Sequence, residues 1–112
     1  MALNVLICDD SAFARKQMAR ALPNDWPVTL HFAEHGQQGL EQILSGQGDL
    51  VFLDLTMPIM DGYQVLQALK EQEVRTKVVV VSGDIQPEAR RRDHAATALT
   101  RLRLVIRILT RR

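Results

Sequence analysis

Short apolar runs that alternate with amphipathic segments constrain the fold of this chain more than any other feature. Residues 4–8, 50–54 and 77–82 are strongly apolar, and the last run holds four consecutive valines, which predicts buried strands. Residues 28–33 alternate apolar and polar side chains, which predicts an edge strand. Apolar residues at helical spacing predict three helices and their inward residues: 11–22 (Phe13, Met18, Leu22), 36–45 (Leu40, Ile43, Leu44) and 63–72 (Val65, Leu66, Leu69). Asp10 or Ser11 is expected to cap the first of these helices. Pro87 suits the first turn of a fourth helix that runs to residue 94.

This order of elements predicts an α/β fold. Strands that alternate with helices of about ten residues imply right-handed crossovers and a parallel sheet that is covered on both faces. Residues 95–109 fit two patterns, a helical stripe and a strand near residues 102–108. The β-branched residues there, and the need for a fifth strand, favour the strand. We therefore expect a core domain at residues 1–94, followed by an Arg-rich segment at residues 95–112.

Acidic side chains stand at the ends of two predicted strands. Asp9 and Asp10 follow the first apolar run, and Asp54 ends the run that begins at Leu50. The carboxyl ends of neighbouring parallel strands meet in one crevice, which is where ligands bind in such sheets. Three converging carboxylates repel one another unless a cation lies among them, and Mg²⁺ prefers such hard oxygen ligands. The sequence predicts a magnesium site beside one reactive aspartate.

Size and composition exclude several classes of protein. A chain of 112 residues is expected to form one domain with a core of its own. The single cysteine, Cys8, excludes an internal disulfide framework, and its place in an apolar strand predicts a buried thiol. No apolar stretch reaches the roughly 20 residues of a membrane helix, and no signal sequence is evident. A cytoplasmic location is the default expectation. His31, His35 and His94 show no ligand spacing and are expected on the surface.

Charge is distributed unevenly along the chain. Residues 1–89 hold 6 Lys/Arg and 12 Asp/Glu, a balance of −6, whereas residues 90–112 hold 8 Arg and one Asp, a balance of +7. An arginine-rich tail suggests nucleic-acid binding. The acidic body opposes that interpretation, and no recognition motif precedes the tail, so nucleic acid is not an expected partner.

Three motifs make the chain resemble the receiver domain of bacterial two-component response regulators, of the chemotaxis-regulator type. They are the acid pair in Leu-Ile-Cys-Asp-Asp-Ser at residues 6–11, the run Asp-Leu-Thr-Met-Pro-Ile-Met-Asp-Gly at residues 54–62, and Val-Val-Val-Ser-Gly at residues 79–83. The resemblance covers residues 3–94. It implies a doubly wound, flavodoxin-like sheet in the order 2-1-3-4-5.

The resemblance also implies a function and a role for each site residue. Asp54 would accept a phosphoryl group from a histidine kinase or a phosphotransfer protein. Asp10 would bind Mg²⁺ directly, and Asp9 mainly through water, beside Asp54 and the backbone carbonyl of Thr56. Ser82 would hydrogen-bond a phosphoryl oxygen and act as the switch. Such a receiver is not an enzyme in the usual sense, because it assists only its own phosphorylation and hydrolysis.

The tail departs from the receiver pattern. Receivers carry a lysine followed by proline after the fifth strand, but the lysines here are Lys16, Lys70 and Lys77, and no proline follows Pro87. Arg103 is the nearest candidate for the lysine's role, although a planar guanidinium differs from a compact ammonium. The last strand and last helix are therefore expected to be atypical or incomplete. That would expose apolar surface around residues 78–81 and favour self-association.

A second hypothesis follows from the missing lysine. The chain would then be a pseudo-receiver that acts as a protein interaction or dimerisation module, whether or not its acids bind metal. The downstream target or output domain is not identified by any motif in the sequence.

Overall fold

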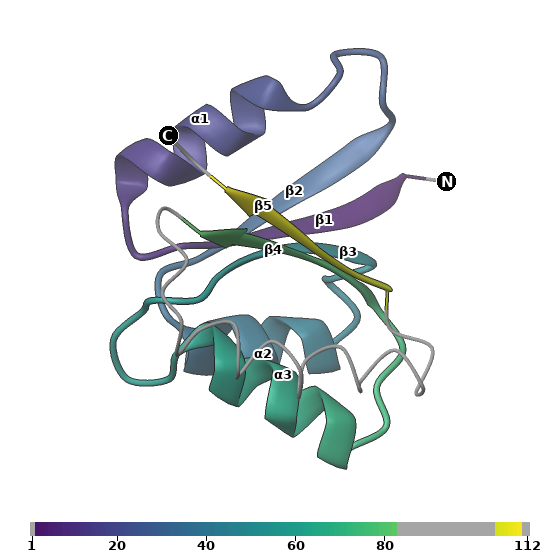
Figure 1. The fold of residues 1–112 in the computed structure, drawn as a ribbon. Helices are drawn as coiled ribbons and strands as arrows, with labels where there is room; N and C mark the ends of the chain where they lie inside the picture. The colour runs from purple at the N-terminus through teal and green to yellow at the C-terminus, as the bar shows by residue number, and fades with distance from the viewer. Residues whose placement is uncertain (1, 83–104, 111–112) are drawn as a thin grey trace.

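A computed structural model of the chain forms a parallel sheet with helices on both faces (Figure 1). The structure describes residues 2–81 and the backbone of residues 82 and 105–110. The sheet order is β2-β1-β3-β4-β5, which confirms the predicted doubly wound, flavodoxin-like α/β fold. The elements are β1 (Leu3–Cys8), α1 (Ala12–Ala21), β2 (Val28–Ala33), α2 (Gly36–Leu44), β3 (Leu50–Asp54), α3 (Gly62–Glu71), β4 (Lys77–Ser82) and β5 (Val105–Thr110).

The predicted strand bounds agree closely with the structure except at the last strand. β2, β3 and β4 begin and end where the sequence pattern places them, and β2 lies at a sheet edge. β5 occupies residues 105–110 instead of 102–108. Its register explains the shift, because Lys77 pairs with Val105 and Ser82 pairs with Thr110, so the strand matches β4 residue for residue. The predicted fourth helix and the boundary at residue 94 lie outside the described residues.

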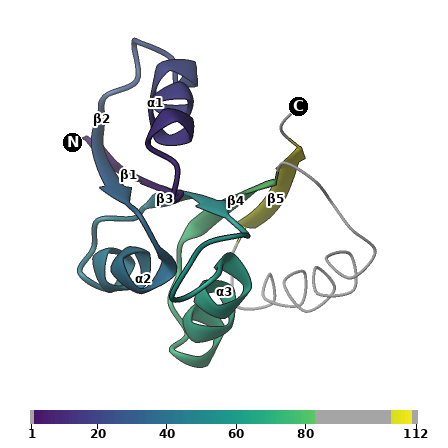
Figure 2. The same ribbon diagram turned by 90° about the vertical axis from the view of Figure 1, so that its left-hand side faces the viewer.

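The main core lies between the sheet and the pair α2 and α3 (Figure 2). Alternate residues of β1, β3 and β4 point to this side, because successive side chains of a strand face opposite ways. The predicted inward residues of α3 are confirmed, since Val65, Leu66 and Leu69 are all buried. In α2, Leu40 and Ile43 are buried but Leu44 is 47% exposed, so the prediction for Leu44 is wrong. Leu44 is the last residue of α2.

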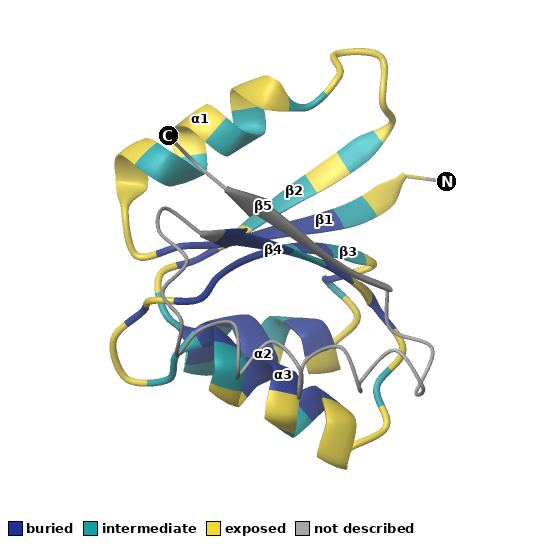
Figure 3. Ribbon diagram, viewed as in Figure 1, coloured by how far each residue is buried: buried dark blue, intermediate teal, exposed yellow. Residues whose placement is uncertain are grey.

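α1 covers the opposite face of the sheet and buries none of its own residues (Figure 3). The predicted apolar stripe of Phe13, Met18 and Leu22 is only partly correct. Met18 and Leu22 are half-buried, whereas Phe13 is 68% exposed. Phe13 lies in the first turn of α1. Phe32 of β2 is also exposed. The two faces of the sheet therefore differ in how completely they are closed.

The expected exposure around residues 78–81 is wrong for three of the four valines. Val78, Val80 and Val81 are buried, and Val79 is half-buried. The reason is their place in the sheet, because β4 lies between β3 and β5 and is covered from the α3 side. The exposed large apolar residues in the described part of the chain are instead Leu3, Phe13, Trp26, Phe32, Leu44 and Ile59.

Side chains cap all three described helices. Ser11 is the N-cap of α1, and its Oγ accepts a hydrogen bond from the N–H of Ala14, so the cap is Ser11 and not Asp10. Asp61 and Gln64 form a capping box at α3. At α2 the N-cap is His35, whose Nδ1 accepts a hydrogen bond from the N–H of Gln38. His31 and His35, which were expected on the surface, are half-buried and hydrogen-bonded. His94 lies outside the described residues.

Candidate metal centre

Three carboxylates meet where β1 and β3 end. β1 ends at Cys8 and β3 ends at Asp54, and the register of the two strands pairs Cys8 with Leu53. Asp9, Asp10 and Asp54 each offer one carboxylate oxygen, and these oxygens lie within 4.8 Å of one another. Asp9 and Asp54 are buried, whereas Asp10 is exposed. The parallel topology thus gathers these residues, which we call the acidic cluster, at one end of the sheet.

Backbone N–H groups orient the two buried members of the acidic cluster. Asp9 Oδ1 accepts a hydrogen bond from the N–H of Ser11 at 2.9 Å, and Asp54 Oδ1 accepts one from the N–H of Thr56 at 3.3 Å. Both bonds reach two residues along the chain, which is the local bonding that Asp side chains favour at turns. The loop that follows each strand therefore fixes the orientation of the carboxylate at the end of that strand.

Arg15 joins α1 to this end of the sheet. Its Nη1 donates a hydrogen bond to the backbone carbonyl of Asp9 at 2.7 Å, and its Nη2 lies 3.8 Å from Oε1 of Glu34. The Arg15 side chain is 15% exposed and that of Glu34 is 72% exposed. The hydrogen bond from a charged donor is the stronger contact, at about 1.5–3 kcal/mol, while an exposed ion pair contributes about 0–1 kcal/mol.

Cys8 lies directly beneath the acidic cluster. Burial, together with the negative charges of Asp54 and Asp9, raises the pKa of its thiol from 9.0 to about 12, and the positive charge of Arg15 opposes part of that rise. Its Sγ lies within hydrogen-bond reach of the carbonyl of His35, at 3.6 Å, and of Sδ of Met57, at 3.5 Å. The predicted buried thiol is confirmed. At neutral pH it is protonated, so it is not a thiolate nucleophile or metal ligand.

A tight turn carries the chain from Asp54 towards α3. Ile59 has a φ of 69°, a left-handed conformation that is rare for a β-branched residue, and the N–H of Met60 donates to the carbonyl of Pro58 at 2.7 Å. The loop is tied to α2 because the N–H of Gly36 donates to the carbonyl of Met60 at 2.9 Å. A Cβ at Gly36 would meet that carbonyl oxygen, so glycine is required for this close approach.

The structure describes the positions of two of the three remaining predicted site residues, Thr56 and Ser82. Thr56 is exposed in the loop after β3, and its N–H is the donor to Asp54. Ser82 is the last residue of β4, and the residue before it, Val81, pairs with Asp54 across the sheet. Ser82 therefore stands at the same sheet end as the acidic cluster. Arg103 lies outside the described residues.

The donor set of the acidic cluster suits a hard divalent cation. All three side chains offer carboxylate oxygens, which Mg²⁺ and Ca²⁺ prefer, and the thiol of Cys8 remains protonated. Three carboxylates so close together repel one another, and a bound cation removes that repulsion. The residues present therefore fit Mg²⁺, with Asp10 as the member that faces solvent.

Arg15 was not identified from the sequence as part of this site. One signal was available, because Arg15 lies four residues after the cap Ser11 and so falls one helical turn above the residues that follow β1. The capping role of His35 was also missed, since histidine is not among the preferred N-cap residues. Neither residue carries a motif of its own, and both act through contacts to the backbone.

Comparison with known proteins gives a family. The family model described as the response regulator receiver domain matches residues 5–102. The chemotaxis protein CheY of Bacillus subtilis is 34% identical over 83 residues, which span 74% of this chain and 69% of that protein. A protein-glutamate methylesterase/protein-glutamine glutaminase of Symbiobacterium thermophilum is 43% identical over 82 residues, but these span only 22% of its length.

Solved structures show the same fold. The Vibrio cholerae chemotaxis protein CheY4 superposes with a TM-score of 0.78 at 21% identity, over 99% of this chain and 88% of that one. The response regulator domain of Thermotoga maritima CheB gives a TM-score of 0.73 at 25% identity, over 98% and 78% of the two chains.

Among the described residues, no helix has the length and apolar character that a membrane crossing requires.

Proposed function

The chain belongs to the response regulator receiver domain family, and we propose that it accepts a phosphoryl group on Asp54 from a histidine kinase or a phosphotransfer protein in two-component signalling. The observation that carries this proposal is the convergence of Asp9, Asp10 and Asp54 at one end of the sheet. The proposal concerns the receiver role alone. It assigns no methylesterase activity, because the chain spans only a fifth of the methylesterase relative.

Asp54 is suited to act as the nucleophile. One of its carboxylate oxygens would attack the phosphorus of a phosphohistidine, forming an O–P bond as the P–N bond breaks and the imidazole leaves with the electron pair. Phosphoryl transfer needs little covalent assistance and depends on positioning. The burial of Asp54 and its hydrogen bond from Thr56 supply that positioning before any donor arrives.

The acidic cluster would hold the cofactor. Asp9, Asp10, Asp54 and the backbone carbonyl of Thr56 are the proposed protein ligands of Mg²⁺. When bound, Mg²⁺ supplies positive charge that offsets the negative charge on the phosphoryl oxygens. The exposure of Asp10 keeps one side of the acidic cluster accessible to a donor protein.

Ser82 and Arg103 complete the proposed site. The hydroxyl of Ser82, at the end of β4, would donate a hydrogen bond to a phosphoryl oxygen and so couple phosphorylation to the segment that follows it. Arg103 is the proposed substitute for the family lysine, since no lysine follows Lys77. A planar guanidinium in that role would alter the strength of the switch more than the chemistry at Asp54.

A small phosphodonor tests the chemistry without the partner. After incubation with acetyl phosphate and Mg²⁺, the intact chain is expected to gain about 80 Da in mass spectrometry. A chelator present throughout the incubation should prevent that gain. Asp54→Asn should abolish it. Asp49→Asn is the matched control, because Asp49 precedes the same strand at the opposite end of the sheet, where it accepts a hydrogen bond from the N–H of Asn4. That control should be phosphorylated like the wild type.

The absent lysine gives the second candidate function a specific basis. In a pseudo-receiver, no mass gain would appear on Asp54 with acetyl phosphate or with a donor kinase, and the chain would act by binding alone. A mass in solution that rises with protein concentration, and is the same in Asp54→Asn, would support that function. A gain that is lost in Asp54→Asn but kept in Asp49→Asn would exclude it.

A further inference from the structure

Asp10 is the least constrained member of the acidic cluster. Asp9 and Asp54 each accept a hydrogen bond from a backbone N–H two residues further on. Among the described residues, none donates a hydrogen bond to the carboxylate of Asp10, which is exposed. Its direction is therefore set by the backbone on which it stands, and above all by the peptide that joins it to Asp9.

That peptide is held by one side chain. The guanidinium of Arg15 donates to the carbonyl oxygen of Asp9, and this carbonyl belongs to the Asp9–Asp10 peptide. Because a peptide unit is planar, fixing its carbonyl also fixes the bond that leads to the Cα of Asp10. Arg15 is itself mostly buried and stands on α1, whose cap Ser11 is in turn the donor to Asp9 Oδ1. The contacts form a closed loop around the corner between β1 and α1.

We propose that Arg15 is a positioning residue of the acidic cluster, which fixes the Asp9–Asp10 peptide and thereby the direction in which Asp10 presents its carboxylate to Mg²⁺. The inference rests on the proposed function in taking Mg²⁺ as the ligand, and it adds a residue that touches neither the metal nor the phosphoryl group. Residues that orient metal ligands typically change metal affinity by about 10–100-fold when they are removed.

The sign of the effect separates positioning from simple charge. Arg15 is a cation close to a cation site, so removing its charge alone would strengthen Mg²⁺ binding. Removing its hold on the Asp9–Asp10 peptide would weaken binding, because Asp10 then samples directions away from the other two carboxylates. The two effects are opposite, and a measured dissociation constant shows which of them is larger.

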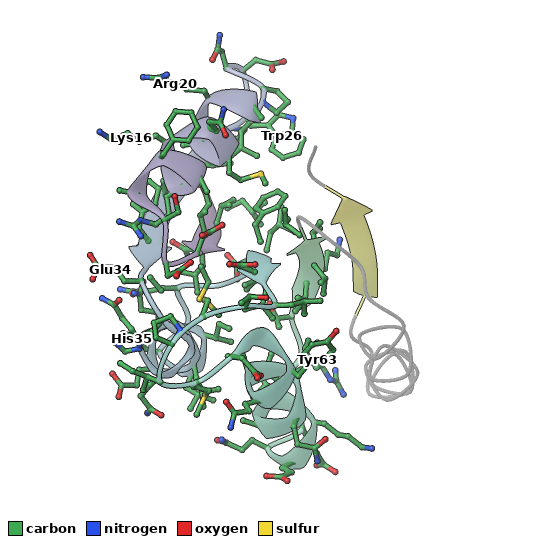
Figure 4. The ribbon with its side chains drawn as sticks, turned by 60° about the vertical axis from the view of Figure 1, so that its left-hand side comes forward. Lys16, Arg20, Trp26, Glu34, His35 and Tyr63 are labelled. Atoms are coloured by element: carbon green, nitrogen blue, oxygen red, sulfur yellow. The ribbon has the colours of Figure 1, made fainter. Side chains whose placement is uncertain are left out.

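The test is a titration of the intact chain with MgCl₂, followed by isothermal calorimetry, for the wild type and matched variants. Arg15→Met keeps the unbranched stem and removes the donor, and its Kd for Mg²⁺ should rise about tenfold. Arg15→Lys keeps the charge and one donor, and its Kd should lie between the two. Arg20→Met removes the same charge from an exposed position further along α1, where the side chain extends away from the body (Figure 4), and should leave the Kd unchanged.

Glu34→Gln separates the two contacts of Arg15. It weakens the exposed ion pair and leaves the hydrogen bond to the Asp9 carbonyl, so the Kd should stay at the wild-type value. The free energy of unfolding in urea, measured without Mg²⁺, is recorded for every variant. A purely structural role for Arg15 would lower that free energy and leave the Kd of the folded protein unchanged.

Several results would overturn the proposal. They are an unchanged or lower Kd in Arg15→Met, an equal rise in Arg20→Met, or a rise in Glu34→Gln as large as that in Arg15→Met. If the wild type itself binds no Mg²⁺, the proposed function fails instead. If the wild type binds Mg²⁺ and gains phosphate on Asp54 while Arg15→Met binds Mg²⁺ equally well, only the role of Arg15 fails.

Discussion

The two faces of the sheet are built in different ways. On one face, α2 and α3 each bury four residues, and the main apolar cluster of the molecule lies between them and the strands. On the other face, α1 buries none of its residues, and its apolar residue Met18 is only half-buried. Two hydrogen bonds link this helix to the end of β1, one from the N–H of Ser11 to Asp9 Oδ1 and one from Arg15 to the carbonyl of Asp9.

This difference separates stability from function. The face with α2 and α3 removes large apolar area from water, which is the main source of folding free energy. The face with α1 contributes less burial but carries the polar contacts to Asp9 from Ser11 and Arg15, whereas Asp54 is oriented by Thr56 in the loop that leads to α3. A pocket beneath α1 reaches Asp9 and Asp54 and is lined by Ile7, Cys8, Asp9, Ala14, Met18, Phe52, Asp54 and Val81. The site thus lies on the less tightly closed side of the sheet.

The largest expected effect compares one apolar residue from each face. Leu69 of α3 is 0% exposed, and Leu69→Ala should lower the free energy of unfolding by about 2–5 kcal/mol because it leaves a cavity in the core. Phe13 of α1 is 68% exposed, and Phe13→Ala should change that free energy by less than about 1 kcal/mol. Urea unfolding followed by circular dichroism measures both. Equal losses in the two variants would show that the faces are not different in stability.

The second prediction concerns the thiol of Cys8, which belongs to the main apolar cluster and lies at the end of β1. The pKa of Cys8 is about 12 in the folded chain, and its ordinary value is 9.0. Above pH 9 the unfolded chain releases this proton while the folded chain keeps it, so stability is full below pH 9 and falls as the pH rises towards 12. At pH 10 the loss should be about 1.4 kcal/mol relative to pH 7.

Cys8→Ala isolates this contribution from other groups that titrate at high pH. The difference in unfolding free energy between wild type and Cys8→Ala should be constant from pH 6 to pH 8 and shrink above pH 9. A difference that stays constant up to pH 10 would mean that the Cys8 pocket is open to water. Because the thiol of Cys8 stays protonated and buried in the folded chain, the folded wild type should also resist alkylation by iodoacetamide at pH 8.

The smallest expected effect concerns the caps of the two faces. Ser11→Ala removes the side-chain cap of α1 and should cost about 1 kcal/mol of stability. Asp61→Ala removes the hydrogen bond from the N–H of Gln64 to Asp61 Oδ1 and keeps the backbone N–H of residue 61, so it should also cost about 1 kcal/mol. Hydrogen exchange should show faster exchange of the Ala14 amide in Ser11→Ala and of the Gln64 amide in Asp61→Ala. Exchange that speeds up throughout both helices would indicate that the caps support whole helices.

Much of the fold was predictable because its signals are local. The apolar runs fixed the bounds of β2, β3 and β4, and the alternation of strands with helices implied a parallel sheet. The acids at the strand ends were predictable for the same reason, since parallel strands bring their carboxyl ends together. The resemblance to receivers supplied the order of the strands, which the pattern of apolar residues does not contain.

The errors arose where a helix meets the sheet. Phe13 and Leu44 both fit an apolar helical stripe, yet both are exposed, and each lies in a terminal turn of its helix. Periodicity identifies the face of a helix but not how far along its length that face is covered. The hydrogen bond from Arg15 to the carbonyl of Asp9 was missed for a related reason, since it joins α1 to the end of β1.

The sequence by itself determined which segments are strands, which are helices, and which strand ends carry acids, because apolar periodicity and chain-breaking residues act over a few neighbouring positions. Only the tertiary structure decided that α2 and α3 close one face while α1 leaves the other partly open, and that Arg15 reaches the carbonyl of Asp9. Those features depend on the packing of elements distant in sequence, and packing distances and helix placement are set by the whole set of side chains at each contact.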